Sequence, residues 1–254
     1  DGSIISRANF KRYRHNDCES LENLLNESKS KSNLVVSDSL FSMDGDIANL
    51  QKIYSKVQNN GGLLLVDEAH ALGVYGENGR GLVNKSSLNK KLNTFITGTF
   101  GKAVGTFGAF FSGDKDSVDY IIQKARSYIY STSLPINAVE ATRKSLKIVE
   151  EENWRREKLF SLINYFRKNI NKSGFSVLDS SSQIQALLIG SSKDALYLSE
   201  ELFKNGIYIP AIRPPTVEEG KSRLRISITT DHQESDIDHL INILHTISRN
   251  LVQS

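Results

Sequence analysis

Residues 63–70 read LLLVDEAH, and this short stretch decides how the first half of the chain folds. The run of leucines and valine follows two glycines and ends in a carboxylate. A fully apolar run of this length is typical of a strand buried on both faces of a sheet. Asp67 therefore stands at the carboxyl end of a predicted strand, and in α/β sheets ligands bind at that edge.

Similar apolar runs and helical patterns alternate on either side of this stretch. Three further short strands are predicted, at Leu34–Ser37, Phe95–Thr97 and Ala109–Ser112. Between the first of these and residue 63, apolar residues recur on one face of a helix, namely Ile47, Leu50, Ile53, Tyr54 and Val57. The residues 59–62, Asn-Asn-Gly-Gly, end that helix. Strands that alternate with helices indicate an α/β sheet with crossover connections.

The rest of the chain has a different pattern. From about Pro135 to Asn171 the sequence is helical and rich in charge. Strands are then predicted at Gln185–Ile189, Ile207–Ile212 and Leu224–Thr229, with helices at Lys193–Asn205 and around Ile237–Ile247. We therefore expect a large domain over residues 1–150 with a mixed, mostly parallel sheet, and a smaller α+β domain over residues 151–254.

Composition excludes several classes of protein. The chain has 254 residues, of which 39% are hydrophobic and 24% charged, as in ordinary globular domains. The net charge of +3 is too small to indicate a nucleic-acid partner. No apolar run approaches the roughly 20 residues that a membrane helix needs, and Asp1–Ser6 do not resemble a signal peptide. Cys18 is the single cysteine, which fits a reducing, cytoplasmic compartment.

Polar residues follow three of the predicted strands, namely Ser42, Asp67 and Lys102. Lys102 is flanked by small residues, with Phe100 and Val104 close by in sequence. We expect these two side chains to surround the lysine and lower the pKa of its amine. A neutral lysine amine can attack an aldehyde. The simpler alternative is a solvated surface lysine.

Residues 67–70, Asp-Glu-Ala-His, also match the box of one helicase class, in which the acids serve Mg²⁺ and a nucleotide. That interpretation requires a phosphate loop, Gly-x-x-x-x-Gly-Lys-[Ser/Thr], upstream of the box. The Gly-Lys pair at Gly101-Lys102 lies downstream of the box, and Ala103 follows it. The pattern thus disfavours a helicase, and we expect no metal site.

Pyridoxal phosphate (PLP) chemistry is the alternative for the same residues. Asp67 could pair with the protonated pyridine nitrogen of this cofactor, which makes the ring a better electron sink. His70 could hydrogen-bond the ring hydroxyl or a substrate. Taken singly, Asp67 could equally cap a helix and His70 could be a satisfied polar group.

Several motifs together carry a resemblance over essentially the whole chain. They are HND at 15–17, SMDGD at 42–46, DEAH at 67–70 with GVYG at 73–76 and GRG at 79–81, TFGK at 99–102, YSTSLP at 130–135 and RLR at 223–225. In this order the motifs resemble the α-oxoamine synthases, PLP enzymes that condense an amino acid with an acyl-CoA and release CO₂. The resemblance implies the aspartate-aminotransferase-like fold and a homodimer with shared active sites.

The resemblance also implies roles for individual residues. Lys102 would hold PLP as a Schiff base and act as the general base, while Asp67 would pair with the pyridine nitrogen. The remaining cofactor contacts would be Ser42 and His70 at the ring, Thr99 at the phosphate, and Ser131 and Thr132 at the phosphate of the neighbouring subunit. The substrate contacts would be Arg225 at the amino-acid carboxylate, with Arg213 and Thr216 near the acyl group. Turn hydrogen bonds for Ser131 and Thr132, and a surface ion pair for Arg225, are the alternatives.

Residues 211–217, AIRPPTV, indicate which members of the family the chain resembles. They resemble the members of the family that join L-alanine to pimeloyl-CoA, or pimeloyl carrier protein, to make 8-amino-7-oxononanoate in biotin biosynthesis. A rigid turn at Pro214-Pro215 without a substrate role is the alternative. A sister enzyme such as glycine C-acetyltransferase and a non-catalytic subunit also stay open.

The start of the sequence departs from the family pattern. The family has a substantial segment before the position of Asp1, including a His that stacks on the PLP ring and a Gly-rich turn near the phosphate. We therefore expect the N-terminal part of the large domain to be absent from this chain. A polypeptide that started at Asp1 would bind the cofactor weakly.

Overall fold

The structure, a computed structural model, describes residues 2–252, with side chains up to residue 249. The chain forms two compact units. Unit 1 contains the residues up to Leu40 and those from Ala48 to Glu150, whereas unit 2 contains Phe41–Ile47 and the residues from Glu151 onward. A short segment early in the sequence therefore packs with the C-terminal unit.

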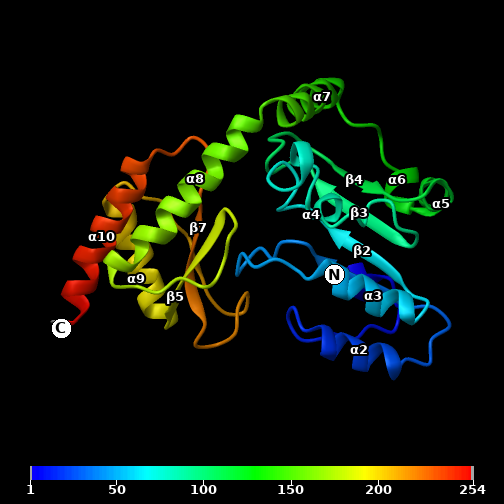
Figure 1. Ribbon diagram of the computed structural model, residues 1–254, viewed down its shortest axis with the longest axis horizontal. Helices are drawn as coiled ribbons and strands as arrows, with labels where there is room; N and C mark the ends of the chain where they lie inside the picture. The colour runs from blue at the N-terminus through cyan, green and yellow to red at the C-terminus, as the bar shows by residue number, and fades with distance from the viewer. Residues whose placement is uncertain (1, 253–254) are drawn as a thin grey trace. The chain divides into compact units, whose positions relative to one another are not determined.

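A four-stranded sheet forms the centre of unit 1 (Figure 1). Its strands follow the order of the sequence, and they are β1 (Leu34–Asp38), β2 (Leu63–Asp67), β3 (Thr94–Thr99) and β4 (Ala109–Ser112). The first three strands are parallel, and β4 pairs with β3 antiparallel. The expected mixed, mostly parallel sheet is confirmed.

The two faces of this sheet are buried to different extents. Val35, Leu64 and Val66 are buried on one face, together with Leu50, Ile53 and Val57 of α3 (Leu50–Asn59). On the other face, Leu34 is 56% exposed and Val36 is 47% exposed. Alternation along each strand therefore sends one set of side chains into the core and leaves the other largely uncovered within the described residues.

The remaining helices of unit 1 are mostly short. They are α1 (Gly2–Ile5), α2 (Cys18–Asn26), the 3₁₀ turn η1 (Glu77–Gly79), α4 (Leu82–Lys85), α5 (Lys115–Lys124), α6 (Arg126–Ile129) and α7 (Ile136–Glu151). Asp17 begins α2 by accepting hydrogen bonds from the backbone N–H groups of Glu19 and Ser20, as an N-cap residue does. Among the described residues, α5 and α6 bury no side chain.

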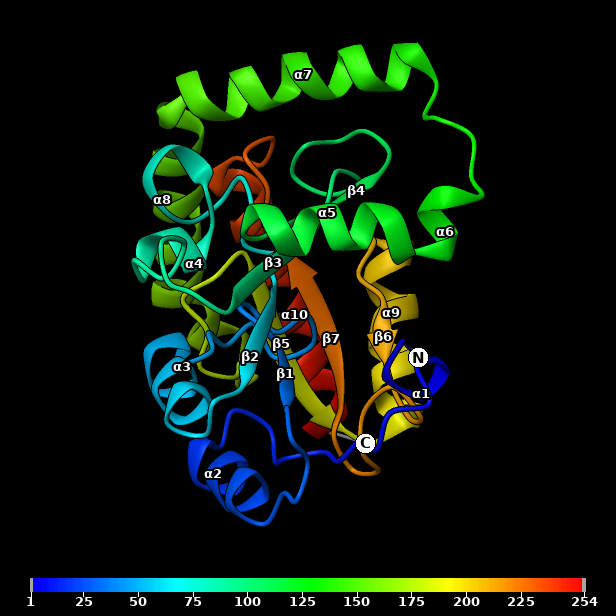
Figure 2. The same ribbon diagram turned by 90° about the vertical axis from the view of Figure 1, so that its right-hand side faces the viewer.

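Unit 2 is built on a three-stranded antiparallel sheet. The strand order is β5 (Ile184–Gly190), β7 (Ser222–Ser227) and β6 (Ala211–Ile212). Its helices are α8 (Asn153–Asn169), η2 (Ile170–Ser173), α9 (Ser192–Lys204) and α10 (Glu234–Val252), and Figure 2 shows α9 beside β6. Phe166, Leu198, Leu224 and Leu244 are fully buried and form the centre of its core.

Two predicted elements are divided or shortened in the structure. The helical stretch from Pro135 to Asn171 is two helices, because Glu152 leaves the helical conformation between α7 and α8. The strand predicted at 207–212 is reduced to Ala211–Ile212. The N–H of Ile207 instead bonds the carbonyl of Leu202 at the end of α9, and Pro210 has no N–H to give to a sheet.

The segment Phe41–Ile47 is held in unit 2 by a buried hydroxyl. Ser180 Oγ lies 2.9 Å from the carbonyl oxygen of Gly45 and 2.7 Å from that of Ile184. Gly45 has φ of +77°, and a Cβ there would collide with the backbone of Ile184. The close approach of the two backbones therefore requires glycine at position 45.

None of the helices in the described part of the chain combines the length and the apolar character needed to cross a membrane.

Candidate active site

The carboxyl ends of the parallel strands carry the polar residues that the sequence singled out. The register pairs Asp38 of β1 with Asp67 of β2, and Asp67 with Thr97 of β3. Residues paired across parallel strands point to the same face of a sheet. One edge of unit 1 therefore presents two neighbouring aspartates.

Asp67 has one oxygen engaged and one free within the described residues. Its Oδ1 accepts a hydrogen bond of 2.7 Å from the N–H of Ala69 and so caps the turn after β2. The simpler interpretation of Asp67 as a capping residue is therefore observed. Its Oδ2 has no hydrogen-bond partner among the described residues, so the cap leaves one oxygen available to a ligand.

Lys102 and His70 meet at this edge. Lys102 Nζ lies 2.8 Å from His70 Nε2, a hydrogen-bond distance. Lys102 comes three residues after the end of β3, and His70 three residues after the end of β2. Because β2 and β3 are adjacent and parallel, their two following turns bring an amine and an imidazole into contact.

The loop that carries Lys102 is anchored on both sides. It closes on itself through a bond from Thr106 N–H to the carbonyl of Phe100. Helix α7 holds it through Ser145 Oγ, which donates to the carbonyl of Val104 at 2.6 Å, and through Thr142 Oγ1, 2.7 Å from Thr106 Oγ1. The backbone around Lys102 is therefore fixed by side chains of α7.

The expectation that Phe100 and Val104 enclose Lys102 is wrong for the described residues. Lys102 is exposed. Val104 is buried, at 3% exposure, and the Phe100 ring stacks on Phe110 with the ring centroids 5.6 Å apart. Both apolar side chains are used in the packing of unit 1, so they do not desolvate the lysine.

Asp38 is the polar residue of this edge that the sequence analysis missed. Burial and the neighbouring carboxylate of Asp67 raise the pKa of Asp38, while Lys102 and His15 act in the opposite direction. A signal was present in the sequence, because Asp38 closely follows the apolar run 34–36, although Ser37 lies between them.

Two of the three predicted phosphate contacts, Thr99 and Ser131, already make local hydrogen bonds. Thr99 Oγ1 donates to the carbonyl of Gly108 at 3.2 Å and accepts from the N–H of Gly101 at 3.1 Å. Ser131 and Thr132 are exposed in the turn after α6, and Ser131 Oγ donates to the carbonyl of Ser127. A phosphate would have to take the place of the Gly108 carbonyl as the acceptor for Thr99.

In unit 2, two arginines of β7 have different surroundings. Arg223 is 4% exposed and forms an ion pair with Asp44. Arg225 donates from Nε to the carbonyl of Ser42 at 2.6 Å, and within the described residues no carboxylate pairs with it. Burial lowers the pKa of Arg225. The structure therefore places a half-buried guanidinium against the backbone of Ser42.

Arg213 and Thr216 lie at the two ends of one turn. The N–H of Thr216 bonds the carbonyl of Arg213 at 3.0 Å, around a cis peptide bond between Pro214 and Pro215. Both side chains are exposed. The rigid turn that the two prolines predicted is therefore present, and it presents one cation and one hydroxyl to the solvent.

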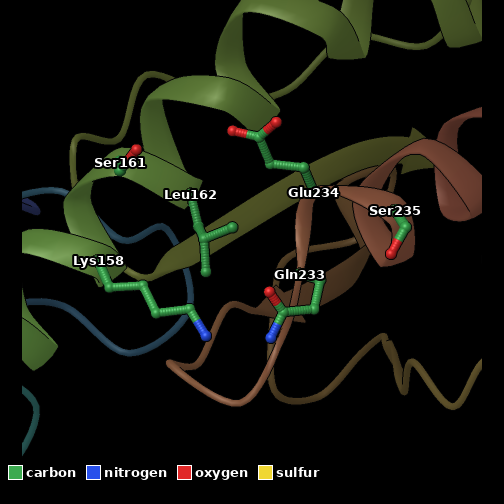
Figure 3. A pocket seen from close by; sticks show the side chains of 6 residues that line it. All are labelled: Lys158, Ser161, Leu162, Gln233, Glu234 and Ser235. Atoms are coloured by element: carbon green, nitrogen blue, oxygen red, sulfur yellow. The ribbon is translucent and has the colours of Figure 1, made fainter.

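Unit 2 also contains an open cleft of about 440 Å³, away from these residues in the sequence. It is lined by Lys158, Ser161, Leu162, Gln233, Glu234 and Ser235, from α8 and the beginning of α10 (Figure 3). The amine of Lys158 donates to the carbonyl of Thr230 at 2.6 Å. None of the predicted site residues lines this cleft.

The raised pKa of Asp38 predicts a pH dependence of stability. Folding favours the neutral carboxyl, so its contribution is present at low pH and is lost as the pH rises from about 4 through the raised pKa. Asp38→Asn cannot ionise. We expect its free energy of unfolding, relative to that of the unchanged chain, to increase with pH, as measured by urea denaturation between pH 4 and 7.

Asp114→Asn is the matched control for this prediction. The N–H of Ser117 holds the pKa of Asp114 below its ordinary value, so its contribution is present above about pH 4 and is lost as the pH falls. The sign of the effect is therefore opposite, and the relative stability of this variant should fall as the pH rises from about 2 to about 4. If the free energy of unfolding of Asp38→Asn, relative to that of the unchanged chain, did not change with pH, the raised pKa of Asp38 would be contradicted.

Comparison with known proteins places these observations in a family. The sequence pattern of the family described as aminotransferase class I and II matches residues 2–244. The 8-amino-7-oxononanoate synthase of Saccharophagus degradans is 44% identical over 249 residues, which cover 98% of this chain and 63% of the relative. That of Nitrosococcus oceani is 46% identical over 244 residues, which cover 96% and 65%. The chain thus spans slightly less than two thirds of the length of these relatives.

Solved structures agree with this assignment. The serine palmitoyltransferase of Sphingomonas wittichii has a TM-score of 0.93 at 28% identity, with 98% of this chain and 63% of that chain covered. That of S. paucimobilis, solved with a bound PLP–myriocin aldimine, has a TM-score of 0.89 at 29% identity, with 96% and 62% covered. The 8-amino-7-oxononanoate synthase of Francisella tularensis has a TM-score of 0.83 at 28% identity, with 99% and 72% covered.

These relatives bear out the resemblance to the α-oxoamine synthases and exclude the helicase interpretation of residues 67–70. The fold expected from that resemblance is confirmed as well. The chain belongs to the aminotransferase class I and II family.

Proposed function

We propose that this chain binds PLP and condenses L-alanine with pimeloyl-CoA, or with pimeloyl carrier protein, to give 8-amino-7-oxononanoate in biotin biosynthesis. The reaction releases CO₂ and either CoA or the free carrier protein. The observation that carries the proposal is the 2.8 Å contact between Lys102 Nζ and His70 Nε2, beside Asp67. The names of the relatives with 44–46% identity support the choice of substrates.

The residues of unit 1 fit the cofactor. PLP, when bound, supplies an electron sink for the negative charge that develops at the amino-acid Cα. Lys102 offers an exposed amine for covalent attachment. The free Oδ2 of Asp67 suits the pyridine nitrogen, because a carboxylate next to that nitrogen favours its protonated form. By the resemblance, His70 and, from unit 2, Ser42 would contact the ring, and Thr99, Ser131 and Thr132 would contact the phosphate.

Lys102 also has the position of a general base. Its amine would take the proton from the Cα of the bound amino acid. His70 Nε2, 2.8 Å away, can accept a hydrogen bond from the resulting ammonium and hold it in place. The two residues therefore work as a pair, with Lys102 moving the proton and His70 orienting the amine.

Unit 2 supplies groups that suit the substrates. The Nε of Arg225 is engaged by the carbonyl of Ser42, which leaves the two terminal nitrogens for a carboxylate in paired hydrogen bonds. Arg213 and Thr216 are exposed on one turn. Their charge and hydroxyl suit the pimeloyl group, which ends in a carboxylate.

A homodimer is part of the proposal. Helices α5 and α6 bury no side chain among the described residues, and Tyr128 and Tyr130 are 64% and 74% exposed. Exposed aromatic groups of this kind are typical of surfaces that pair with another chain. Such pairing would cover the surface that precedes Ser131 and Thr132.

Sedimentation velocity tests the homodimer. At micromolar concentration we expect a single species of twice the chain mass, and Tyr128→Ser together with Tyr130→Ser should shift it towards the monomer. Tyr197→Ser, an exposed tyrosine of α9, is the control and should leave the dimer intact. A monomer for the unchanged chain would contradict this part of the proposal.

Borohydride trapping tests the role of Lys102. With added PLP, the chain should turn yellow, and reduction should leave a phosphopyridoxyl group on Lys102 in the peptide map. Lys102→Ala should lose this label and reduce turnover by a factor of at least about 1,000, since it removes both the attachment point and the base. Lys85→Ala, a lysine of α4, should behave as the unchanged chain. Full labelling at another lysine would refute the assignment.

Substrate assays test the narrower claim. The chain should prefer alanine with pimeloyl-CoA or pimeloyl carrier protein over glycine with acetyl-CoA. Arg225→Lys should raise the KM for alanine about 10- to 100-fold, because a lysine cannot offer paired donors. Arg249→Lys, near the end of α10, is the matched control. A preference for glycine and acetyl-CoA would identify a sister enzyme such as glycine C-acetyltransferase instead.

A further inference from the structure

Glu68 is a buried acid to which the proposed reaction gives no role. Its side chain is 1% exposed. The carboxylate accepts three hydrogen bonds, from Ser39 Oγ at 2.9 Å, from the N–H of Leu82 at 3.0 Å and from the N–H of Val83 at 2.5 Å. Both oxygens are engaged, Oε2 twice and Oε1 once. A buried carboxylate with this many donors fixes the segments that supply them.

The contact with Leu82 and Val83 requires a close approach at Gly81. A Cβ at Gly81 would lie 2.7 Å from the carboxyl carbon of Glu68, and Gly81 has φ of +93°. Any other residue would push the carboxylate away from the N–H groups of α4. Glu68 and Gly81 therefore close the loop 71–81 against the end of β2.

The loop 71–81 packs against Ala103, the residue that follows Lys102. Its two arms are joined by bonds from Gly73 N–H to the carbonyl of Gly79 and from Gly81 N–H to the carbonyl of Tyr75, both 2.7 Å. A Cβ on Gly73 would lie only 2.7 Å from the Cβ of Ala103. The loop that Glu68 closes is therefore packed directly against the residue after Lys102.

Glu68 also lies next to the other functional residues in the chain. Asp67 precedes it, His70 follows two residues later, and its partner Ser39 follows Asp38. The carbonyl of Glu68 accepts the N–H groups of Ala71 and Leu72, which form the turn that carries His70. Glu68 thus supports His70 through the turn that its carbonyl closes. It supports Lys102 through the loop 71–81, which packs against Ala103.

We propose that Glu68 is a positioning residue, whose buried carboxylate joins the ends of β1 and β2 to the loop 71–81 and so sets the contact between His70 and Lys102. The effect that we expect Glu68 to have on PLP binding rests on the proposed function. Burial raises the pKa of Glu68 despite the three hydrogen bonds, as expected for a carboxylate held for its contacts at a cost in solvation.

Glu68→Gln is the variant that tests this role. The amide keeps the volume of the side chain, but its NH₂ group turns one acceptor into a donor that faces the donors of Ser39 or α4. Val57→Ala is the control, because Val57 is fully buried in α3 of the same unit and does not contact the network. It measures the effect of general destabilisation alone.

The first measurement is amide hydrogen exchange on the chain without added PLP. In Glu68→Gln, the N–H groups of Ala69 and Ala71 should exchange at least about tenfold faster than in the unchanged chain, which corresponds to the loss of one buried hydrogen bond. Those of α3 should change no more than they do in Val57→Ala. Unchanged exchange at Ala69 and Ala71 would overturn the proposal.

The second measurement is a spectroscopic titration with PLP. The Kd of Glu68→Gln should rise at least about tenfold, and that of Val57→Ala less than about twofold. Ser39→Ala should have a smaller effect, and the double variant should be less than additive, because both residues act in one network. A Kd that rises no further in Glu68→Gln than in Val57→Ala would also overturn the proposal. If the unchanged chain takes up no PLP, the proposed function fails and the exchange measurement alone decides the role of Glu68.

Discussion

The parallel pairing of β1, β2 and β3 is the constraint on which unit 1 depends. Parallel strands must all end at the same edge, so the residues that follow them meet there whatever their distance in sequence. This is why Asp38, Asp67 and Thr97 stand in register and why the turns after β2 and β3 bring His70 to Lys102. The direction of the strands sets where the proposed active site lies, and the side chains at that edge set its chemistry.

Buried charge is handled in two ways in this structure. Arg223 pairs with the opposite charge of Asp44, and Glu68 accepts hydrogen bonds from N–H and O–H donors, so both serve the fold. Arg225 has a backbone carbonyl as its partner and no carboxylate among the described residues. Arg225 is only half-buried, and a guanidinium without a carboxylate partner can bind an anionic ligand. The contrast between the two arginines of β7 supports the proposal that Arg225, rather than Arg223, contacts the substrate carboxylate.

Much of the fold could be predicted from periodicity. The apolar run 63–66 is a central strand, and the period of apolar residues from 50 to 57 is the buried face of α3. The strand predicted at 207–212 was too long, because the N–H of Ile207 ends α9. Whether Ile207 belongs to the end of α9 or to a strand depends on how α9 packs against its neighbours. The residue types alone do not determine this. Likewise, Phe100 and Val104 are apolar as expected, yet they take part in the packing of unit 1 and leave Lys102 exposed.

The candidate site was predicted in part for a similar reason. Asp67, His70 and Lys102 stand in recognisable motifs, so the sequence by itself determined the family and the residues on which the proposed chemistry rests. Only the tertiary structure decided that Asp38 lies beside Asp67, that Arg225 lacks a carboxylate partner within the described residues, and that Glu68 joins three segments. Motifs record local order along the chain, whereas register, burial and hydrogen-bond partners are set by segments that come together only when the chain folds.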